Sequence, residues 1–312
     1  MHRILWLLAG AVVLIDIIWA ATVHFDIDRR GYLFVTEVAA GVGALAVFYG
    51  RVRRDERLCA MLSGTAFLVV FSAAFALMNY MLLTVAGPRI DSQLATLDRA
   101  MGFHWVSVMI FMAHHRVLNF LLQCFYGSLL PQIALLVLVL GWAGQRGDVF
   151  RFCLSVAIGA FVTVLFWTLF PSFGAFSVYR LPAGVEAHLS LALDRHYADD
   201  LVHLLVFGPG WISPDSIRGL IGFPSFHAAL AVMAGWYAAQ IRYLGWPAAL
   251  LNAGVLVATP IQGGHHLVDV IGGVAVAAFA IVSSARVATA VQQSDGVGNS
   301  VRPAVAGQTV PG

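Results

Sequence analysis

The feature that most constrains this chain is a series of apolar runs about as long as membrane-spanning helices. A helix rises 1.5 Å per residue, so about 20 apolar residues cross the hydrocarbon core of a bilayer. Only 11% of the residues are charged and 60% are hydrophobic, which is too little polar surface for a soluble domain of 312 residues. We therefore expect an all-α, polytopic membrane protein with eight spans, at residues 4–23, 32–49, 58–85, 118–140, 152–169, 226–243, 246–258 and 267–290.

The first run follows Arg3 and could also be a cleaved signal peptide. It is long enough to span and more spans follow it, so we interpret it as the first transmembrane helix. The final residues, from 292 onward, have no periodicity and are expected to form a disordered cytoplasmic tail.

Arginine placement predicts the orientation of these spans, because short cytoplasmic loops carry an excess of basic residues. All 18 basic residues are arginine, and the densest run is Arg51-Val-Arg53-Arg54-Asp-Glu-Arg57. Placing that run in the cytoplasm leaves two long segments outside, about 87–116 and 171–222. Within the first of these, residues 91–115 mix charged and apolar side chains, as an amphipathic helix in the membrane interface does.

The first segment with polar residues at an outer helix start is Gly222-Phe-Pro224-Ser225-Phe-His227. Pro224 ends any preceding helix, Ser225 is a natural N-cap, and His227 falls in the first helical turn. A helix N-terminus offers free backbone N–H groups and the positive end of a dipole, so this segment suits an anion such as phosphate.

The second segment is Gly263-Gly264-His265-His266-Leu-Val-Asp269. His265 and Asp269 are four residues apart and share one helical face, whereas His266 has no carboxylate four residues on. A carboxylate bonded to one ring nitrogen leaves the other nitrogen free to attack. A lone histidine here would be an interfacial residue reaching water, but three ionisable residues at two helix starts favour a functional site.

Pro224-Ser225-Phe-His227 followed by His265-x-x-x-Asp269 resembles the second and third signature motifs of the phosphatidic acid phosphatase type 2 superfamily. The doublet His265-His266, with Val268-Asp269 and Ile271-Gly272-Gly273, is similar to the inositolphosphotransferase branch, which includes inositol phosphorylceramide synthases. Two upstream stretches, Leu97-Asp98-Arg99-Ala-Met-Gly102-Phe103 and Tyr126-Gly-Ser128-Leu-Leu-Pro131-Gln132, also look like that branch.

The resemblance implies a role for each matching residue. His265 would attack phosphorus and form a phosphohistidine, Asp269 would orient His265, and His227 would protonate the leaving group and activate the acceptor. Ser225 and nearby backbone N–H groups, including that of Gly264, would hold the phosphate oxygens. The family requires no metal or other cofactor.

The chain departs from the superfamily in its basic residues. The first motif begins with lysine and ends in Arg-Pro, but this chain has no lysine, and the nearest remnant is Tyr179-Arg180-Leu-Pro182. The third motif commonly has an arginine six residues before its histidine, where Thr259 stands here. Arg180, Arg218 or Arg99, in that order, would then supply the positive charge.

Three other kinds of protein fit the sequence less well. A metalloenzyme is disfavoured because no His-Glu-x-x-His signature or repeated histidine box is present, and a nucleic-acid binder because the arginines are scattered. A lipid or solute transporter is the non-enzymatic alternative. It would show paired broken helices in two related halves, whereas these motifs cluster in one half.

We therefore expect a phosphotransferase that acts on a lipid phosphate or phospholipid head group at the extracytoplasmic face of a bacterial inner membrane. A lipid phosphate or pyrophosphate phosphatase with the same histidines is the alternative. The domain boundaries would be 1–57 for two N-terminal helices and a cytoplasmic loop, 58–291 for a catalytic six-helix bundle, and 292–312 for the tail.

Overall fold

The computed structural model describes residues 1–23, 26–193, 195–208 and 210–300, and these residues are all-helical apart from two short paired strands. The first six helices are α1 (His2–Val23), α2 (Arg29–Phe48), α3 (Glu56–Met81), α4 (Asp91–Ala100), α5 (Trp105–His114) and α6 (Arg116–Gly127). The other six are α7 (Leu129–Trp142), α8 (Arg146–Leu169), α9 (Arg195–Phe207), α10 (Phe226–Ala238), α11 (Gly245–Gln262) and α12 (Leu267–Ser300). Strands β1 (Asp26–Ile27) and β2 (Trp211–Ile212) pair in parallel, and short turns at Tyr49–Arg53, Leu82–Val85, Ala175–Ser177 and Glu186–His188 complete the fold.

Five helices of the described chain are long and apolar enough to cross a membrane, and the bent pair α5–α6 makes a sixth if it counts as one span. A helical membrane protein is thus confirmed, while the count of eight spans stays a prediction. The expected span at 118–140 is divided into α6 and α7 at Ser128. Pro131 explains the break, because its ring displaces the carbonyl of Gly127 four residues earlier.

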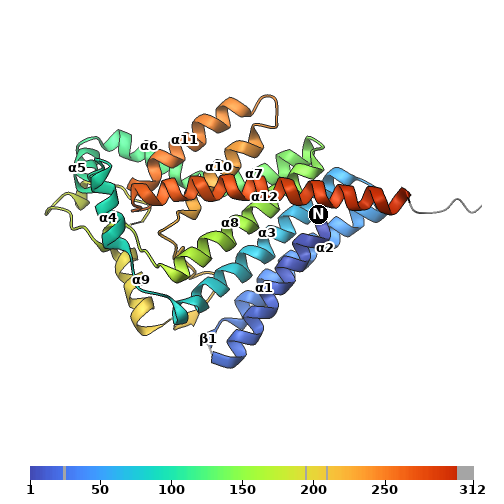
Figure 1. Ribbon diagram of the computed structural model, residues 1–312, viewed down its shortest axis with the longest axis horizontal. Helices are drawn as coiled ribbons and strands as arrows, with labels where there is room; N and C mark the ends of the chain where they lie inside the picture. Colours follow the sequence, from blue (N-terminus) through green and yellow to red (C-terminus); the bar gives the residue numbers. More distant parts are fainter. Residues whose placement is uncertain (24–25, 194, 209, 301–312) are drawn as a thin grey trace, which may run out of the picture.

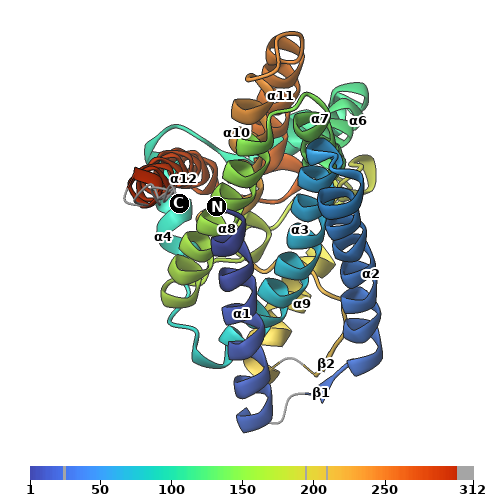
Figure 2. The same ribbon diagram turned by 90° about the vertical axis from the view of Figure 1, so that its right-hand side faces the viewer.

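The bundle is centred on α3 and α8. Helix α12 packs along α8, α10 packs against α7, α8, α11 and α12, and the N-terminal pair α1 and α2 packs mainly on α3 (Figures 1 and 2). Buried apolar side chains from α7, α8, α10, α11 and α12 form one core, and those from α1, α3 and α8 form a second. The N-terminal helices therefore add to one side of a bundle that the later helices complete.

The segment expected to hold one interfacial helix contains two, α4 and α5, separated by residues 101–104. Helix α4 buries four residues spaced as one helical face, namely Asp91, Leu94, Ala95 and Asp98. Figure 1 shows α4 and α5 at the end of the bundle where α12 begins. One face of α4 is thus committed to the protein and not to the bilayer interface.

The predicted tail overlaps the last helix. Helix α12 extends to Ser300, so residues 292–300 are helical, and residues 301–312 lie outside the described part of the chain.

Candidate active site

The two polar segments meet at the adjoining first turns of α10 and α12. The Ser225 N–H donates to the Asp269 carbonyl over 2.9 Å, and the Ser225 Oγ lies 3.3 Å from His265 Nε2. Gly273 allows this approach, because a Cβ there would lie 2.3 Å from the Ser225 carbonyl oxygen. This glycine therefore acts as a packing contact between two helices.

His265 and Asp269 form the expected pair, with Nδ1 and Oδ2 separated by 3.1 Å. Asp269 is fully buried and His265 is 7% exposed. The same carboxylate oxygen also accepts the His266 N–H at 2.9 Å. If Nδ1–H donates to Asp269, the Nε2 of His265 carries a free electron pair and accepts from the Ser225 hydroxyl.

Ser225 holds α10 as its N-cap, since its Oγ accepts the Ala228 N–H over 3.3 Å. This hydroxyl therefore connects the start of α10 to the candidate nucleophile on the loop before α12. The first N–H groups of α10, which have no partner within the helix, open at the same place.

His227 lies in the first turn of α10 and stacks on Tyr126 of α6, with ring centroids 4.0 Å apart and planes 13° apart. Its Nε2 lies 3.4 Å from the Tyr126 carbonyl oxygen. His227 and His265 both line one cavity, so the two histidines face a common space. Tyr126 belongs to the second upstream stretch noted in the sequence, which gave no indication of this contact.

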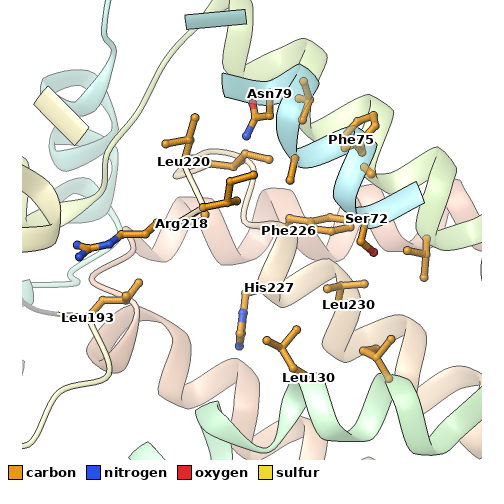
Figure 3. A pocket seen from close by; sticks show the side chains of 18 of the residues that line it. Ser72, Phe75, Asn79, Leu130, Leu193, Arg218, Leu220, Phe226, His227 and Leu230 are labelled. Carbon is orange, nitrogen blue, oxygen red and sulfur yellow. The ribbon is translucent and has the colours of Figure 1, made fainter. Parts of the chain in front are cut away.

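That cavity has a volume of about 790 Å³ and extends from the histidines between α3, α7, α8 and α10. Figure 3 shows His227 projecting into it, and Leu130, Leu230 and Phe226 also line it. Its inner wall is mainly apolar, with side chains that include Leu68, Phe71, Phe75, Ile133, Val156 and Val164. The cavity therefore joins a polar end at the histidines to an apolar end inside the bundle.

The three candidate arginines lie in different places. Arg218 lines the cavity, but its Nη1 donates to Asp200 over 2.7 Å, and its guanidinium points away from His227 in Figure 3. Arg99 is exposed and donates to the Tyr179 hydroxyl at 3.1 Å, and Arg180 is exposed without lining the cavity. Only Arg218, ranked second from the sequence, borders the space that holds the histidines.

Gly264 has a φ of +61°, and its carbonyl accepts the Ala175 N–H at 2.6 Å. A Cβ on Gly264 would lie 2.6 Å from the Phe176 ring. This glycine therefore lets the loop before His265 turn tightly against residues 174–176.

Asp98 is a site residue that the sequence did not identify. Its oxygens lie within 3.2 Å of His266 Nδ1 and of the Leu267 and Val268 backbone nitrogens. His266, which has no carboxylate four residues on in the sequence, thus obtains one from α4. No sequence spacing joins residues 98 and 266; the only signal was the resemblance of residues 97–103 to the inositolphosphotransferase branch.

Comparison with known families gives one match that covers more than half of the chain. A family model described as PAP2 superfamily matches residues 92–283, which run from the start of α4 into α12. No curated protein and no solved structure matches the chain.

Proposed function

Because this chain belongs to the PAP2 superfamily, we propose that it is a lipid phosphotransferase that works through a phosphohistidine at His265. Members of the superfamily are phosphatases or phosphotransferases. The observation that carries the proposal is the His265–Asp269 pair, whose free nitrogen opens on the same cavity as His227. A membrane bundle with a buried, oriented imidazole facing a partly apolar cavity suits attack on a lipid-bound phosphorus.

In the first step, His265 Nε2 attacks phosphorus and the bond to the leaving oxygen breaks. Asp269 accepts a hydrogen bond from Nδ1–H and stabilises the positive charge that develops on the ring. His227, which faces the same cavity, gives its proton to the leaving oxygen. In the absence of substrate, the Ser225 hydroxyl lies next to His265 Nε2. From this position it can donate a hydrogen bond to a phosphate oxygen once the substrate binds.

In the second step, an acceptor hydroxyl attacks the phosphohistidine, and the N–P bond breaks. His227, now unprotonated, takes the acceptor's proton and returns to its starting state. Neither step requires a metal ion in this scheme. Among the residues that the structure describes, no three histidine, cysteine or acidic side chains are grouped to bind one.

A lipid is the substrate class that the cavity favours. A phosphate at the histidines would lie at the polar end, and an acyl or prenyl chain would extend along Phe71, Phe75 and Val164. Each methylene removed from water contributes about 0.8 kcal/mol, so such a wall selects an amphiphile over a soluble phosphate ester. Arg218 would contribute positive charge once it releases Asp200.

We favour transfer to an alcohol, with hydrolysis by water as the alternative, because residues 97–103 and 265–273 resemble the inositolphosphotransferase branch. The proposed topology has eight spans, with α6–α7, α10 and α11 crossing beside the longer helices and the last six spans forming the catalytic bundle. The arginines at 51–57 support an orientation in which the site faces the extracytoplasmic side, and we propose that the membrane is a bacterial inner membrane.

The test uses the purified full chain in nanodiscs with EDTA, a panel of phospholipids and lipid phosphates, and an alcohol acceptor such as inositol. Free phosphate and new lipid products are followed together. We expect a new phospho-head-group lipid from the wild type and none from His265→Ala. Asp269→Asn should lower kcat by about 10³- to 10⁴-fold, as loss of the orienting carboxylate does in other histidine systems.

Free phosphate without a new lipid would identify a phosphatase instead. Full turnover by the His265→Ala variant would refute the phosphohistidine mechanism. Asp148→Asn is the control, because Asp148 is a partly buried carboxylate that pairs with Arg151 at the start of α8, away from the cavity.

A further inference from the structure

Helix α4 presents two buried carboxylates to the site on one face. Asp98 is fully buried and Asp91 is 3% exposed, seven residues apart with Leu94 and Ala95 between them on the same face. A buried carboxylate is costly unless hydrogen bonds compensate its lost hydration. Their partners therefore show what α4 holds in place.

Asp98 caps α12 from outside that helix. Its Oδ2 accepts the Leu267 N–H and its Oδ1 accepts the Val268 N–H, both over 3.0 Å. These N–H groups belong to the first turn of α12, where helical N–H groups have no partner within the helix. A carboxylate also suits the positive end of the helix dipole, so Asp98 stabilises α12 at the turn that carries Asp269.

Asp91 binds the neighbouring loop in the same way. Its Oδ1 accepts from the Ser172 hydroxyl at 3.0 Å and from the Phe173 and Gly174 N–H groups at 2.7 and 3.0 Å. This loop in turn bonds to the loop before His265 through the Ala175 N–H and the Gly264 carbonyl. The two carboxylates of α4 thus hold the start of α12 and the loop at residues 172–174, the two segments beside the candidate nucleophile.

His266 links Asp98 to the catalytic pair. The His266 ring is fully buried and does not line the cavity, so it is not placed to react with a substrate. Its Nδ1 lies 3.2 Å from Asp98 Oδ2, and its backbone N–H donates to Asp269 Oδ2, the atom that binds His265. A continuous series of hydrogen bonds therefore runs from Asp98 through His266 and Asp269 to His265.

We propose that Asp98 and His266 are positioning residues, through which α4 fixes the orientation of the His265–Asp269 pair. The inference rests on the proposed function for its kinetic readout. A displacement of about 1 Å in a reacting group can lower a rate about 100-fold, so loss of this support acts on turnover more than on binding.

The first experiment compares wild type with Asp98→Asn in nanodiscs. The asparagine keeps the side-chain shape but replaces one carboxylate oxygen by an NH₂ group that faces donors. We expect kcat to fall about 10- to 100-fold with KM changed by less than about threefold. Hydrogen exchange measured by mass spectrometry should be faster at the amides of residues 267 and 268.

Asp148→Asn is again the control and should change neither kcat nor exchange at residues 267 and 268. If Asp98→Asn fails to fold, Asp91→Asn replaces it, with faster exchange expected at residues 173 and 174 and the same fall in kcat. Unchanged kcat together with unchanged exchange in a folded Asp98 or Asp91 variant would overturn the proposal.

The second experiment separates hydrogen bonding from packing at His266. His266→Asn keeps a donor close to the position of Nδ1, whereas His266→Phe keeps the ring volume and loses the donor. We expect the asparagine variant to retain at least about tenfold more kcat than the phenylalanine variant. Equal kcat in both variants, or a more active phenylalanine variant, would assign His266 to packing alone.

These outcomes are separable from failure of the proposed function. A wild type that is inactive on every lipid would refute the proposed function, while the exchange measurements at residues 267 and 268 would still test the support by α4. A wild type that is active, with an Asp98→Asn variant equal to it in kcat and exchange, would refute only the positioning role.

Discussion

At the scale of single residues, two adjacent histidines differ because their partners differ. His265 faces the cavity and binds a carboxylate on the next helix, at the spacing that the sequence displays. His266 is buried and binds a carboxylate from α4, 168 residues away. The two histidines therefore cannot be given roles from residue type alone. Their burial and the helix that supplies the carboxylate partner distinguish the two roles.

Arg218 gives the first prediction at this scale. Arg218→Gln should raise KM for a lipid phosphate about 10- to 100-fold with a smaller effect on kcat, because a hydrogen bond to a charged group contributes about 1.5–3 kcal/mol. The same change at the exposed Arg180 should leave KM within about twofold. Steady-state kinetics of both variants decide this, and the opposite ranking would return the phosphate contact to Arg180.

The second prediction concerns pH and His266. Burial lowers the pKa of His266, but the hydrogen bond to Asp98 and the charges of Asp269, Asp98 and Asp91 outweigh it and raise the pKa above 6.5. A pKa raised by folding stabilises the protein fully below the unfolded value, and this stability is lost as pH rises through the folded value.

The Tm of wild type should therefore exceed that of His266→Asn by more at about pH 5.5 than at about pH 9. Scanning fluorimetry across that range in detergent measures the difference. A gap that is constant with pH, or that widens toward pH 9, would show that His266 gains no proton affinity from its surroundings.

At the scale of elements, glycines decide how closely the helix starts and loops of the site approach. Gly273 lets α12 lie against Ser225, and Gly264 lets the preceding loop pass Phe176. Gly264 also has a positive φ, a conformation that glycine adopts without a steric penalty. The close approach to other segments is a property of the packed structure.

Gly264→Ala tests whether the close approach of Gly264 to Phe176 matters in addition to the backbone strain of a positive φ. Gly184 also has a positive φ, +82°, but a Cβ there meets nothing within 4 Å. Gly184→Ala should cost about 1 kcal/mol of stability, and Gly264→Ala should cost about 1–3 kcal/mol more and reduce kcat sharply. Thermal denaturation and turnover of both variants check this. Equal losses of stability and kcat in the two variants would show that the contact with Phe176 has no effect.

At the scale of the whole molecule, the cavity exists because helices distant in the sequence enclose it. Its walls come from α3, α7, α8 and α10, and segments at 191–193 and 217–221 border its polar end. Helix α3 lies outside the part of the chain that the family model matches. The part of the cavity that would receive a lipid chain is thus shared between the family region and the helix before it.

Ala76→Phe on α3 tests this assignment, because Ala76 lines the cavity from a different helix than His227, and a larger side chain there narrows the cavity. We expect kcat/KM to shift by about tenfold or more toward substrates with shorter chains, as a loss of two methylene contacts implies. Leu135→Phe, at a 58% exposed position outside the cavity lining, is the control. A substrate-length profile that is identical in all three proteins would place the lipid chain elsewhere.

The sequence by itself determined the membrane class, the helical fold and the two helix starts that carry Ser225, His227, His265 and Asp269. These follow from local rules, since span length and capping act within one helix, and His265 and Asp269 are only four residues apart in the chain. Only the tertiary structure decided that α4 supports the site, that Arg218 and not Arg180 borders the cavity, and that Tyr126 stacks on His227. Contacts between helices depend on how the whole bundle packs, and no periodicity in one segment records its partner in another.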